Sequence, residues 1–261
     1  MSVVSTFCKK GGVGKSTFIG FLGHYYATLG KKVLIISADD QNSIFKIFGA
    51  DEKIFEVSDN YLEFWLANHT ELGDILIEIR ENLYFIKTLN TDKLSMKLTL
   101  ERAQEKVIKR LISECNEYFD YIFIDFPPSS NRLTEVLLDL SDHILIVVGL
   151  DSLGLDGFFN TIQYFIDNDI NLDGIKYIIP NGYSKNRRAP KISLEKLQKQ
   201  AGDFTPGAIV LPALQDKSII KNLQAEGISV FDDVVLERYD QNAKDLLKKD
   251  LYELFKLIDI D

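Results

Sequence analysis

A glycine-rich segment near the start of the chain, residues 9–17, most constrains how the chain can fold. It reads Lys-Lys-Gly-Gly-Val-Gly-Lys-Ser-Thr. Its end matches the phosphate-binding loop pattern Gly-x-x-x-x-Gly-Lys-Ser/Thr, although Lys9 stands where that pattern begins with Gly. Such a loop joins a β-strand to an α-helix, and residues 3–7 and 16–29 have the composition of a strand and a helix. The sequence therefore predicts a strand, a phosphate loop and a helix in succession.

The residues of this loop have separate expected tasks. Gly11, Gly12 and Gly14 allow the backbone to turn and to present N–H groups to phosphate oxygens. Lys15 is expected to reach the β- and γ-phosphates, and Ser16 to hold Mg²⁺ through its hydroxyl. The start of the helix adds partial positive charge at the same place. We therefore predict a site for phosphate groups and magnesium.

Strand and helix signals alternate along the rest of the chain. Further strands are expected at residues 32–37, 83–86, 121–125, 143–148, 175–179 and 208–211. Further helices are expected at residues 60–79, 98–118, 132–140 and 157–168, and one or two helices within residues 233–258. This alternation predicts an α/β fold with a doubly wound, mostly parallel sheet flanked by helices, as in P-loop nucleotide hydrolases. The absence of repeats and linkers predicts a single domain over residues 1–261.

Composition narrows the class of protein. The chain has 261 residues, of which 46% are hydrophobic, as is normal for a globular fold. No apolar run reaches the roughly 20 residues that a membrane-spanning helix needs, and the strand-like, lysine-containing start does not fit a secretory signal. Cys8 and Cys115 have no metal-binding spacing and are too few for a disulfide scaffold. We therefore expect a reduced, cytoplasmic protein with Cys115 in the core on a helix.

Polar residues stand where the predicted strands end, which is where ligands bind in such sheets. Asp125 ends an apolar strand and precedes Phe-Pro-Pro, so we expect it to support Mg²⁺, directly or through a water. Asp39 and Asp40 follow another strand, and an acid there could orient the attacking water or cap the next helix. Asn181 could bond adenine through its amide, but Asn before Gly favours a turn.

Charge is distributed unevenly along the chain. The formal net charge of −9 argues against binding to nucleic acid. Between residues 176 and 200, however, one acidic residue stands among seven basic ones. A local basic face can bind phosphate backbones if the acidic residues lie elsewhere, although the same pattern fits a solvated loop and helix surface. The basic residues are Lys176, Lys185, Arg187, Arg188, Lys191, Lys196 and Lys199.

Together these motifs resemble the ParA/MinD family of deviant-Walker-A ATPases over nearly the whole length of the chain. Residues 10–17 fit the family's highly specific loop, Lys-Gly-Gly-Val-Gly-Lys-Ser/Thr-Thr. Residues 30–36 resemble the lead into the family's second motif, and residues 120–128 its Asp-Tyr-Ile-x-Ile-Asp-x-Pro-Pro segment. Residues 179–188 are similar to the adenine-side strand and loop, and residues 211–231 to a later nucleotide-side region of ParA-type partition proteins.

The resemblance implies a role for each matching residue. Lys10 is the signature lysine, which crosses an ATP-sandwiched dimer to the partner's nucleotide, and Asp39 is the acid associated with hydrolysis. The expected catalytic residues are Lys10, Lys15, Asp39 and Asp125. The expected metal-binding residues are Ser16 and Asp125. The expected nucleotide-binding residues are Gly11, Gly12, Val13, Gly14, Lys15, Ser16, Thr17, Asn181 and Pro212.

Two positions depart from the family pattern. Ser37 replaces the first Asp of the family's Asp-x-Asp-Pro-Gln motif, and Asp40 replaces its Pro, whereas Gln41 matches. The loss of an acid at Ser37 removes an expected indirect support of Mg²⁺. Asp40 could compete with Asp39 for the attacking water. We therefore expect hydrolysis that is slower or differently controlled.

The resemblance implies a ParA-like ATPase for partition of plasmid or chromosomal DNA. Such a protein forms a homodimer on binding ATP and Mg²⁺, and the dimer binds non-specific DNA. It releases the DNA when a centromere-binding, ParB-like adaptor stimulates hydrolysis. We expect it to associate with the nucleoid in the cytoplasm. The expected DNA-contacting residues are Lys185, Arg187 and Arg188, with Lys217 and Lys221 as weaker candidates.

Other members of the same scaffold class offer alternatives. A MinD-like membrane-positioning ATPase uses a terminal amphipathic helix, and residues 247–258 do contain an apolar stripe. The opposite face mixes acids with lysines, so we expect a helix docked on the core and no membrane binding. An autophosphorylating kinase would carry a terminal tyrosine cluster, whereas the tail has only Tyr239 and Tyr252. An iron–sulfur reductase would need ligand cysteines, and Cys8 and Cys115 are poorly placed.

Overall fold

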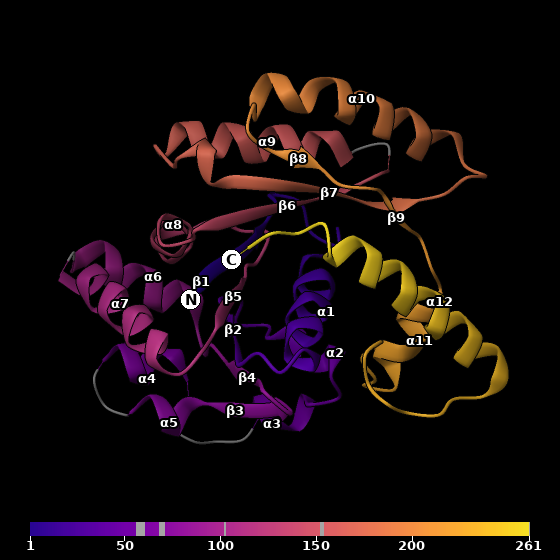
Figure 1. Ribbon diagram of the computed structural model, residues 1–261. Helices are drawn as coiled ribbons and strands as arrows, with labels where there is room; N and C mark the ends of the chain where they lie inside the picture. The colour runs from indigo at the N-terminus through magenta and orange to yellow at the C-terminus, as the bar shows by residue number, and fades with distance from the viewer. Residues whose placement is uncertain (56–60, 68–70, 102, 152–153, 261) are drawn as a thin grey trace.

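A central, mostly parallel sheet carries helices on both faces (Figure 1). The computed structural model describes residues 1–55, 61–67, 71–101, 103–151 and 154–260. Its strands are β1 (Ser2–Phe7), β2 (Val33–Ser37), β3 (Ile77–Arg80), β4 (Leu83–Ile86), β5 (Tyr121–Asp125), β6 (His143–Gly149), β7 (Ile175–Tyr183), β8 (Ile209–Val210) and β9 (Leu214–Gln215). They follow the order β3-β4-β2-β5-β1-β6-β7-β8, and β9 pairs with β7.

The pairing of the strands confirms the predicted fold class. Among the described strands only β3 and β4 pair in antiparallel fashion, and every other pair is parallel. β1 lies between β5 and β6. The first strand therefore forms its hydrogen bonds with strands from the middle of the sequence. All seven expected strands are present, and β3 and β9 are two short strands that the sequence analysis did not anticipate.

The helices cover the sheet in two layers. They are α1 (Lys15–Thr28), α2 (Ser43–Ile47), α3 (Asp51–Phe55), α4 (Leu62–Leu66), α5 (Leu72–Ile75), α6 (Thr91–Leu100), α7 (Ala103–Glu114), α8 (Arg132–Asp139), α9 (Gly154–Asp167), α10 (Arg188–Phe204), α11 (Ile219–Ala225) and α12 (Arg238–Phe255). Helices α1, α2, α11 and α12 share one hydrophobic core, and α4, α7, α8 and α9 share another. Figure 1 shows α1, α2, α11 and α12 on one side of β5, and α4, α7 and α8 on the other.

Alternate residues of each central strand enter the two cores, because successive side chains of a strand point to opposite faces. In β5, Ile122 and Ile124 belong to one core, whereas Tyr121 and Phe123 belong to the other. The strand is therefore buried on both faces and reads as a continuous apolar run, as is typical of parallel sheets.

Two predicted helices are wrong in their extent. The helix expected at residues 60–79 is replaced by α4, α5 and the strand β3, and residues 60 and 68–70 lie outside the described part. The alternation of apolar and charged residues in Ile77–Arg80 has the period of a strand, and β4 pairs with it. The helix expected at residues 98–118 is divided between α6 and α7, because Glu101 has φ −123° and ψ 78°, outside the helical region.

Helix α10, which was not among the expected helices, follows the loop that carries Lys185 and Arg187. It begins at Arg188, and its Pro190 lies in the first turn, where a missing N–H costs no helical hydrogen bond. The one or two helices expected within residues 233–258 are a single helix, which begins at Arg238 and ends at Phe255. Most of the basic segment therefore lies on a helix rather than on a loop.

The final helix docks on the core, as predicted. Leu247, Leu251, Leu254 and Phe255 of its apolar stripe are all buried, and the rings of Phe18 and Phe255 lie 5.6 Å apart edge to face. The expected placement of Cys115 in the core is also confirmed, since it is fully buried in a short 3-10 turn after α7. Within the described residues, every helix is too short or too polar to cross a membrane.

Candidate functional site

The carboxyl ends of five neighbouring strands meet around the glycine-rich loop. The loop itself follows β1, and Asp39 follows β2. Asp125 ends β5, Asp151 follows β6, and Asn181 lies near the end of β7. In the register of β2 and β5, Ser37 lies directly opposite Asp125. The sheet therefore gathers residues that are far apart in the sequence at one edge, where such folds bind ligands.

The loop has the backbone geometry that its glycines permit. Gly12 and Gly14 have φ of 71° and 96°, which side chains rarely allow. A Cβ atom at Gly14 would lie 2.6 Å from Asn181 Nδ2, and that same Nδ2 donates a hydrogen bond of 2.8 Å to the Val13 carbonyl. Gly182, with φ 83°, donates its N–H to Asn181 Oδ1 at 2.9 Å. Asn181 therefore lies in strand β7 rather than in the expected turn, and its side chain contacts the loop.

Lys15 and Lys10 leave the loop in different directions. Lys15 Nζ donates to the carbonyls of Cys8 and Lys10, each at 3.3 Å. Burial lowers the pKa of its ammonium, whereas the negative charges of nearby acidic groups act to raise it. Lys10 Nζ donates to both carboxylate oxygens of Asp151, at 2.6 and 2.7 Å. The side chains of Lys10 and Asp151 are 25% and 62% exposed. Lys15 thus stays beneath the loop, whereas Lys10 points to the rim of the site.

Asp125 is a fully buried carboxylate, and neither of its oxygens has a well-aligned hydrogen-bond partner among the described residues. Burial raises its pKa to about 7, while the Ser16 hydroxyl and the Lys15 ammonium act in the opposite direction. A buried carboxylate without a partner costs free energy unless a cation or a water satisfies it. The position therefore fits the expectation that Ser16 and Asp125 support Mg²⁺.

The carboxylates of Asp39 and Asp40 have different hydrogen-bond partners. Asp39 Oδ1 accepts the Gln41 N–H at 3.0 Å, and burial raises its pKa while that N–H lowers it. Ser37 Oγ donates to the Asp39 carbonyl at 3.0 Å, so the serine braces the backbone beside the acid. Asp40 Oδ2 instead accepts from Thr91 Oγ1 at 3.0 Å, at the start of α6. This geometry gives no support to the expected competition between Asp40 and Asp39 for a water.

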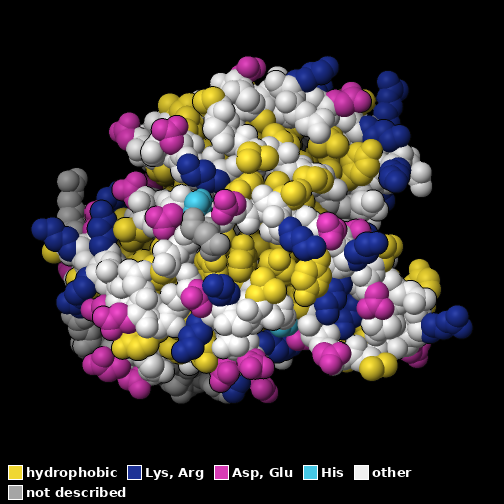
Figure 2. Space-filling view, in the orientation of Figure 1, with side chains coloured by type: hydrophobic (Ala, Val, Ile, Leu, Met, Phe, Trp, Pro, Cys, Tyr) yellow, Lys and Arg dark blue, Asp and Glu magenta, His cyan; other side chains and the backbone are white. Residues whose placement is uncertain are grey.

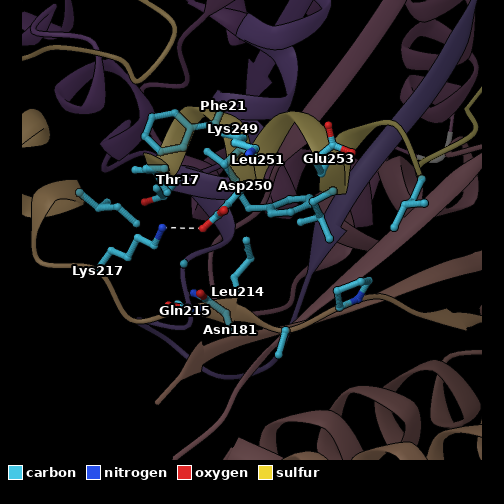
Figure 3. Close-up of a pocket in the computed structure, with 18 residues that line it drawn as sticks. Thr17, Phe21, Asn181, Leu214, Gln215, Lys217, Lys249, Asp250, Leu251 and Glu253 are labelled. Atoms are coloured by element: carbon cyan, nitrogen blue, oxygen red, sulfur yellow. Dashed lines mark hydrogen bonds and ion pairs between the residues drawn. The ribbon is translucent and has the colours of Figure 1, made fainter. Parts of the chain in front are cut away.

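Three cavities adjoin the loop, and Gly14 and Thr17 line all of them. The Asp39 cavity, of about 440 Å³, contains Asp39 and the loop residues nearest to it. The Asn181 cavity, of about 540 Å³, contains Asn181 and the rim of the loop. The α12 cavity, of about 330 Å³, runs between the loop and α12 and contains Pro212 (Figure 3).

The basic residues expected to bind DNA fall into two groups. Lys185, Arg187 and Arg188 are exposed where α10 begins, and Figure 2 shows lysine and arginine side chains gathered at that end of the molecule. Arg187 lies 3.5 Å from Asp216, and both side chains are more than half exposed, so this pair is weak. The structure therefore brings the three stronger candidates together on one surface.

The two weaker candidates lie beside the loop instead. Lys217 is only 14% exposed and pairs with Asp250 at 2.5 Å across the α12 cavity (Figure 3). Lys221 is exposed on α11, and together with Lys217 it lines the Asn181 cavity that Lys10 also enters. The structure thus places Lys217 and Lys221 nearer to the loop than to the surface at the start of α10.

Several residues of the site escaped the sequence analysis. Asp151 stands two residues after the end of β6, so the rule on strand ends could have identified it. Ser43 and Lys46 of α2 line the Asp39 cavity, and Gln224 of α11 donates from Nε2 to Thr17 Oγ1 at 2.9 Å. These three belong to no motif and reach the loop only through the tertiary fold.

Comparison with known proteins agrees with this geometry. The AAA domain family matches residues 1–173, a span that includes the loop, Asp39 and Asp125. Maintenance of carboxysome distribution protein A of Synechococcus elongatus is 26% identical over 239 residues, which cover 88% of this chain and 92% of that protein. Sporulation initiation inhibitor protein Soj of Bacillus subtilis is 28% identical over 180 residues, which cover 66% of this chain and 70% of that protein.

The fold also agrees with solved structures. A protein of Borrelia burgdorferi assigned to plasmid partition, solved with bound AMPPNP, has a TM-score of 0.73 and 20% sequence identity. The match covers 97% of this chain and 99% of that one. Likeness at this level of identity shows a shared fold over the full length of both chains.

Proposed function

Since the chain belongs to the ParA/MinD family of P-loop ATPases, we propose that residues 1–261 form a single ParA-like ATPase domain that partitions plasmid or chromosomal DNA. One observation carries the proposal, namely the separation of the two loop lysines. Lys15 occupies the usual place beneath the loop, whereas Lys10 points to the rim and to Asp151. Names given to similar proteins, in carboxysome distribution and plasmid partition, support a role in positioning large cargo.

ATP and Mg²⁺ are the substrate and cofactor in this proposal. The backbone N–H groups of the loop and Lys15 hold the β- and γ-phosphates, and Thr17 contacts the α-phosphate. Lys15 can exchange its two long carbonyl bonds of 3.3 Å for phosphate oxygens. Ser16 and Asp125 would hold Mg²⁺, which neutralises phosphate charge when bound. Asn181, Pro212 and Val13 lie toward the adenine end.

Hydrolysis is assigned to Asp39, which lines the cavity over the loop and orients the attacking water. Ser37 contributes a hydroxyl where relatives of this family have an acid, so the site has one negative charge fewer near Mg²⁺. Turnover in the isolated protein is therefore slow, and a ParB-like, centromere-binding adaptor stimulates it. Release of the γ-phosphate weakens the contact of Lys10 with the partner's nucleotide.

Dimerisation connects the nucleotide to DNA. With ATP bound, Lys10 leaves Asp151 and reaches the phosphates of a second copy, so that the homodimer forms only with ATP. Each copy presents Lys185, Arg187 and Arg188 at the start of α10, and two linked weak patches gain avidity without new contacts. Contacts of this kind are made to the phosphate backbone and therefore do not depend on sequence. We therefore propose that the protein is located in the cytoplasm, on the nucleoid.

The docked final helix supports the DNA proposal over the membrane alternative. The apolar stripe of α12 is occupied by the core and does not face the surface. A membrane-positioning ATPase would require this helix, or another amphipathic segment, to become free. Flotation with anionic liposomes in the presence of ATP separates the two functions, because only membrane binding carries the protein to the top of the gradient.

The proposed switch is tested by DNA binding in three nucleotide states. Fluorescence anisotropy with a random-sequence duplex should show binding by the wild type with ATP and Mg²⁺, and about tenfold weaker binding with ADP or without nucleotide. Lys10→Ala should still bind ATP, because Lys15 is intact, but should lose the ATP-dependent gain in DNA affinity. Lys31→Ala, an exposed lysine away from the loop, is the matched control. Equal DNA affinity in all three states would refute the switch.

A further inference from the structure

Helix α2 places a further lysine at the phosphate site. Lys46 lines the Asp39 cavity together with Lys15, Ser16 and Asp39. Its side chain is exposed, and the described part of the chain offers it no ion pair or side-chain hydrogen bond. The lysine is therefore a cation that faces a cavity lined by phosphate-binding groups.

The packing of α2 fixes the direction in which Lys46 points. Ile44, Phe45 and Ile47 are buried in the core, and the ring of Phe45 lies 5.2 Å from that of Phe85 in edge-to-face contact. Residues three positions apart share one face of a helix. Ser43 and Lys46 stand at this spacing, and both line the cavity. The helix thus turns one hydroxyl and one ammonium toward the loop.

The two lysines of the loop that lie near the phosphate site, unlike Lys46, already have partners or are buried. Lys10 is paired with Asp151, and Lys15 is buried beneath the loop. The acid in the cavity, Asp39, accepts the Gln41 N–H rather than forming an ion pair with Lys46. An unpaired ammonium beside backbone N–H donors makes the cavity suited to an anion with several charges.

The composition of the cavities indicates which part of the nucleotide Lys46 meets. The Asp39 cavity contains Lys15 and Ser16, the groups for the terminal phosphates and the metal. Asn181 and Pro212 are absent from its lining and instead line the cavities on the adenine side. Lys46 therefore lies at the end of the site where a third phosphate would be bound.

We propose that Lys46 contacts the γ-phosphate of the bound nucleoside triphosphate and thereby helps the site to distinguish ATP from ADP. This inference rests on the proposed ATPase function, but it assigns a contact that the loop motif does not contain. Because Lys46 belongs to the same chain as the loop, it acts in the monomer, before Lys10 reaches a second copy.

The test measures binding without turnover. Calorimetric titrations with the β,γ-imido analogue of ATP and with ADP, both with Mg²⁺, compare the wild type with Lys46→Met and Lys46→Arg. Lys46→Met should bind the analogue about 3- to 10-fold more weakly, as expected for one partly exposed charged contact, and ADP less than about 2-fold more weakly. Lys46→Arg should recover the affinity for the analogue. Lys31→Met, equally exposed but remote from the cavity, should leave both affinities unchanged.

Each other outcome overturns the assignment. Unchanged binding of the analogue by Lys46→Met, or an equal loss for the analogue and ADP, would show that Lys46 does not meet the γ-phosphate. Failure of the wild type to bind the analogue would remove the ATPase function and the role of Lys46 together, so the two failures are distinguishable. Lys46 is exposed, so Lys46→Met should melt at the wild-type temperature, and a lowered melting temperature would identify a role in folding instead.

Discussion

Among single residues, His24, which lies away from the phosphate loop, shows how burial determines the charge of a side chain. The residue is 5% exposed, and its Nδ1 lies 2.8 Å from Ser229 Oγ. Burial lowers the pKa of the ring to about 4. The nearby charge of Asp232 acts to raise this pKa, whereas that of Arg80 acts to lower it. The folded protein therefore holds His24 neutral, in a position that joins α1 to the segment before α12.

The stability of the protein should consequently depend on pH below neutrality. The pKa of His24 falls from 6.5 to about 4 on folding, so the unfolded state binds the proton first as the pH is lowered. The stabilising contribution is complete above pH 6.5 and is lost toward pH 4. Between pH 7 and pH 5 the loss should be about 2 kcal/mol. Urea unfolding should show this part of the pH dependence in the wild type and not in His24→Gln, and equal pH dependence in both would contradict it.

At this scale, sequence patterns identify residues whose task is local. The positive φ angles of Gly12 and Gly14 could be expected, because the loop motif specifies its own backbone. The contact of Asn181 with Val13 spans 168 positions in the chain, and that of Gln224 with Thr17 spans 207. No local pattern encodes such contacts, so they required the fold. The assigned roles of the site residues remain predictions.

At the scale of elements, strands were easier to predict than helices. A buried parallel strand such as Tyr121–Asp125 is apolar on both faces and cannot be mistaken for a surface segment. Helix lengths were overestimated, because apolar residues continue across the break at Glu101 and into β3. The short helix α2, which carries Lys46, has only five residues, too few to show a helical period, and its N-cap residue Asn42 makes no capping hydrogen bond through its side chain.

The end of α2 makes a close backbone contact with the segment after α11. A Cβ atom at Gly227, whose φ is +66°, would lie 2.3 Å from the Cα atom of Gly49. Gly227→Ala should therefore lower the free energy of unfolding by about 2–4 kcal/mol, through the clash and the strained backbone. Denaturant unfolding measures the change. Gly207→Ala, where an added Cβ meets no atom within 4 Å, should have little effect, and equal stability of the two variants would exclude the contact.

For the molecule as a whole, an acidic protein that binds DNA must confine its basic residues to one surface. The net charge is −9, yet Lys185, Arg187 and Arg188 are gathered at the start of α10. This basic surface should attract DNA, and the acidic remainder of the molecule should repel it. Both effects act only over a short distance, because salt screens the charges.

Removing charge from that surface should change the salt dependence of DNA binding. Substitution of Lys185→Ala with Arg188→Ala removes four charges from a dimer. The slope of log K against log salt should become less steep by about 3 to 4, if each charge meets one phosphate. Anisotropy titrations at several salt concentrations with ATP measure this slope. Lys31→Ala with Lys93→Ala makes the same change in net charge on exposed lysines elsewhere and should leave the slope unchanged.

The order of strands in the sheet also determines when the site can form during synthesis. The phosphate loop leaves the ribosome well before the strands with which β1 pairs, Tyr121–Asp125 and His143–Gly149. At the usual rate of translation, those partners emerge roughly ten seconds later. A nascent chain therefore carries a complete nucleotide motif long before it has a nucleotide site, and ATP can stabilise the fold only after those strands have been made.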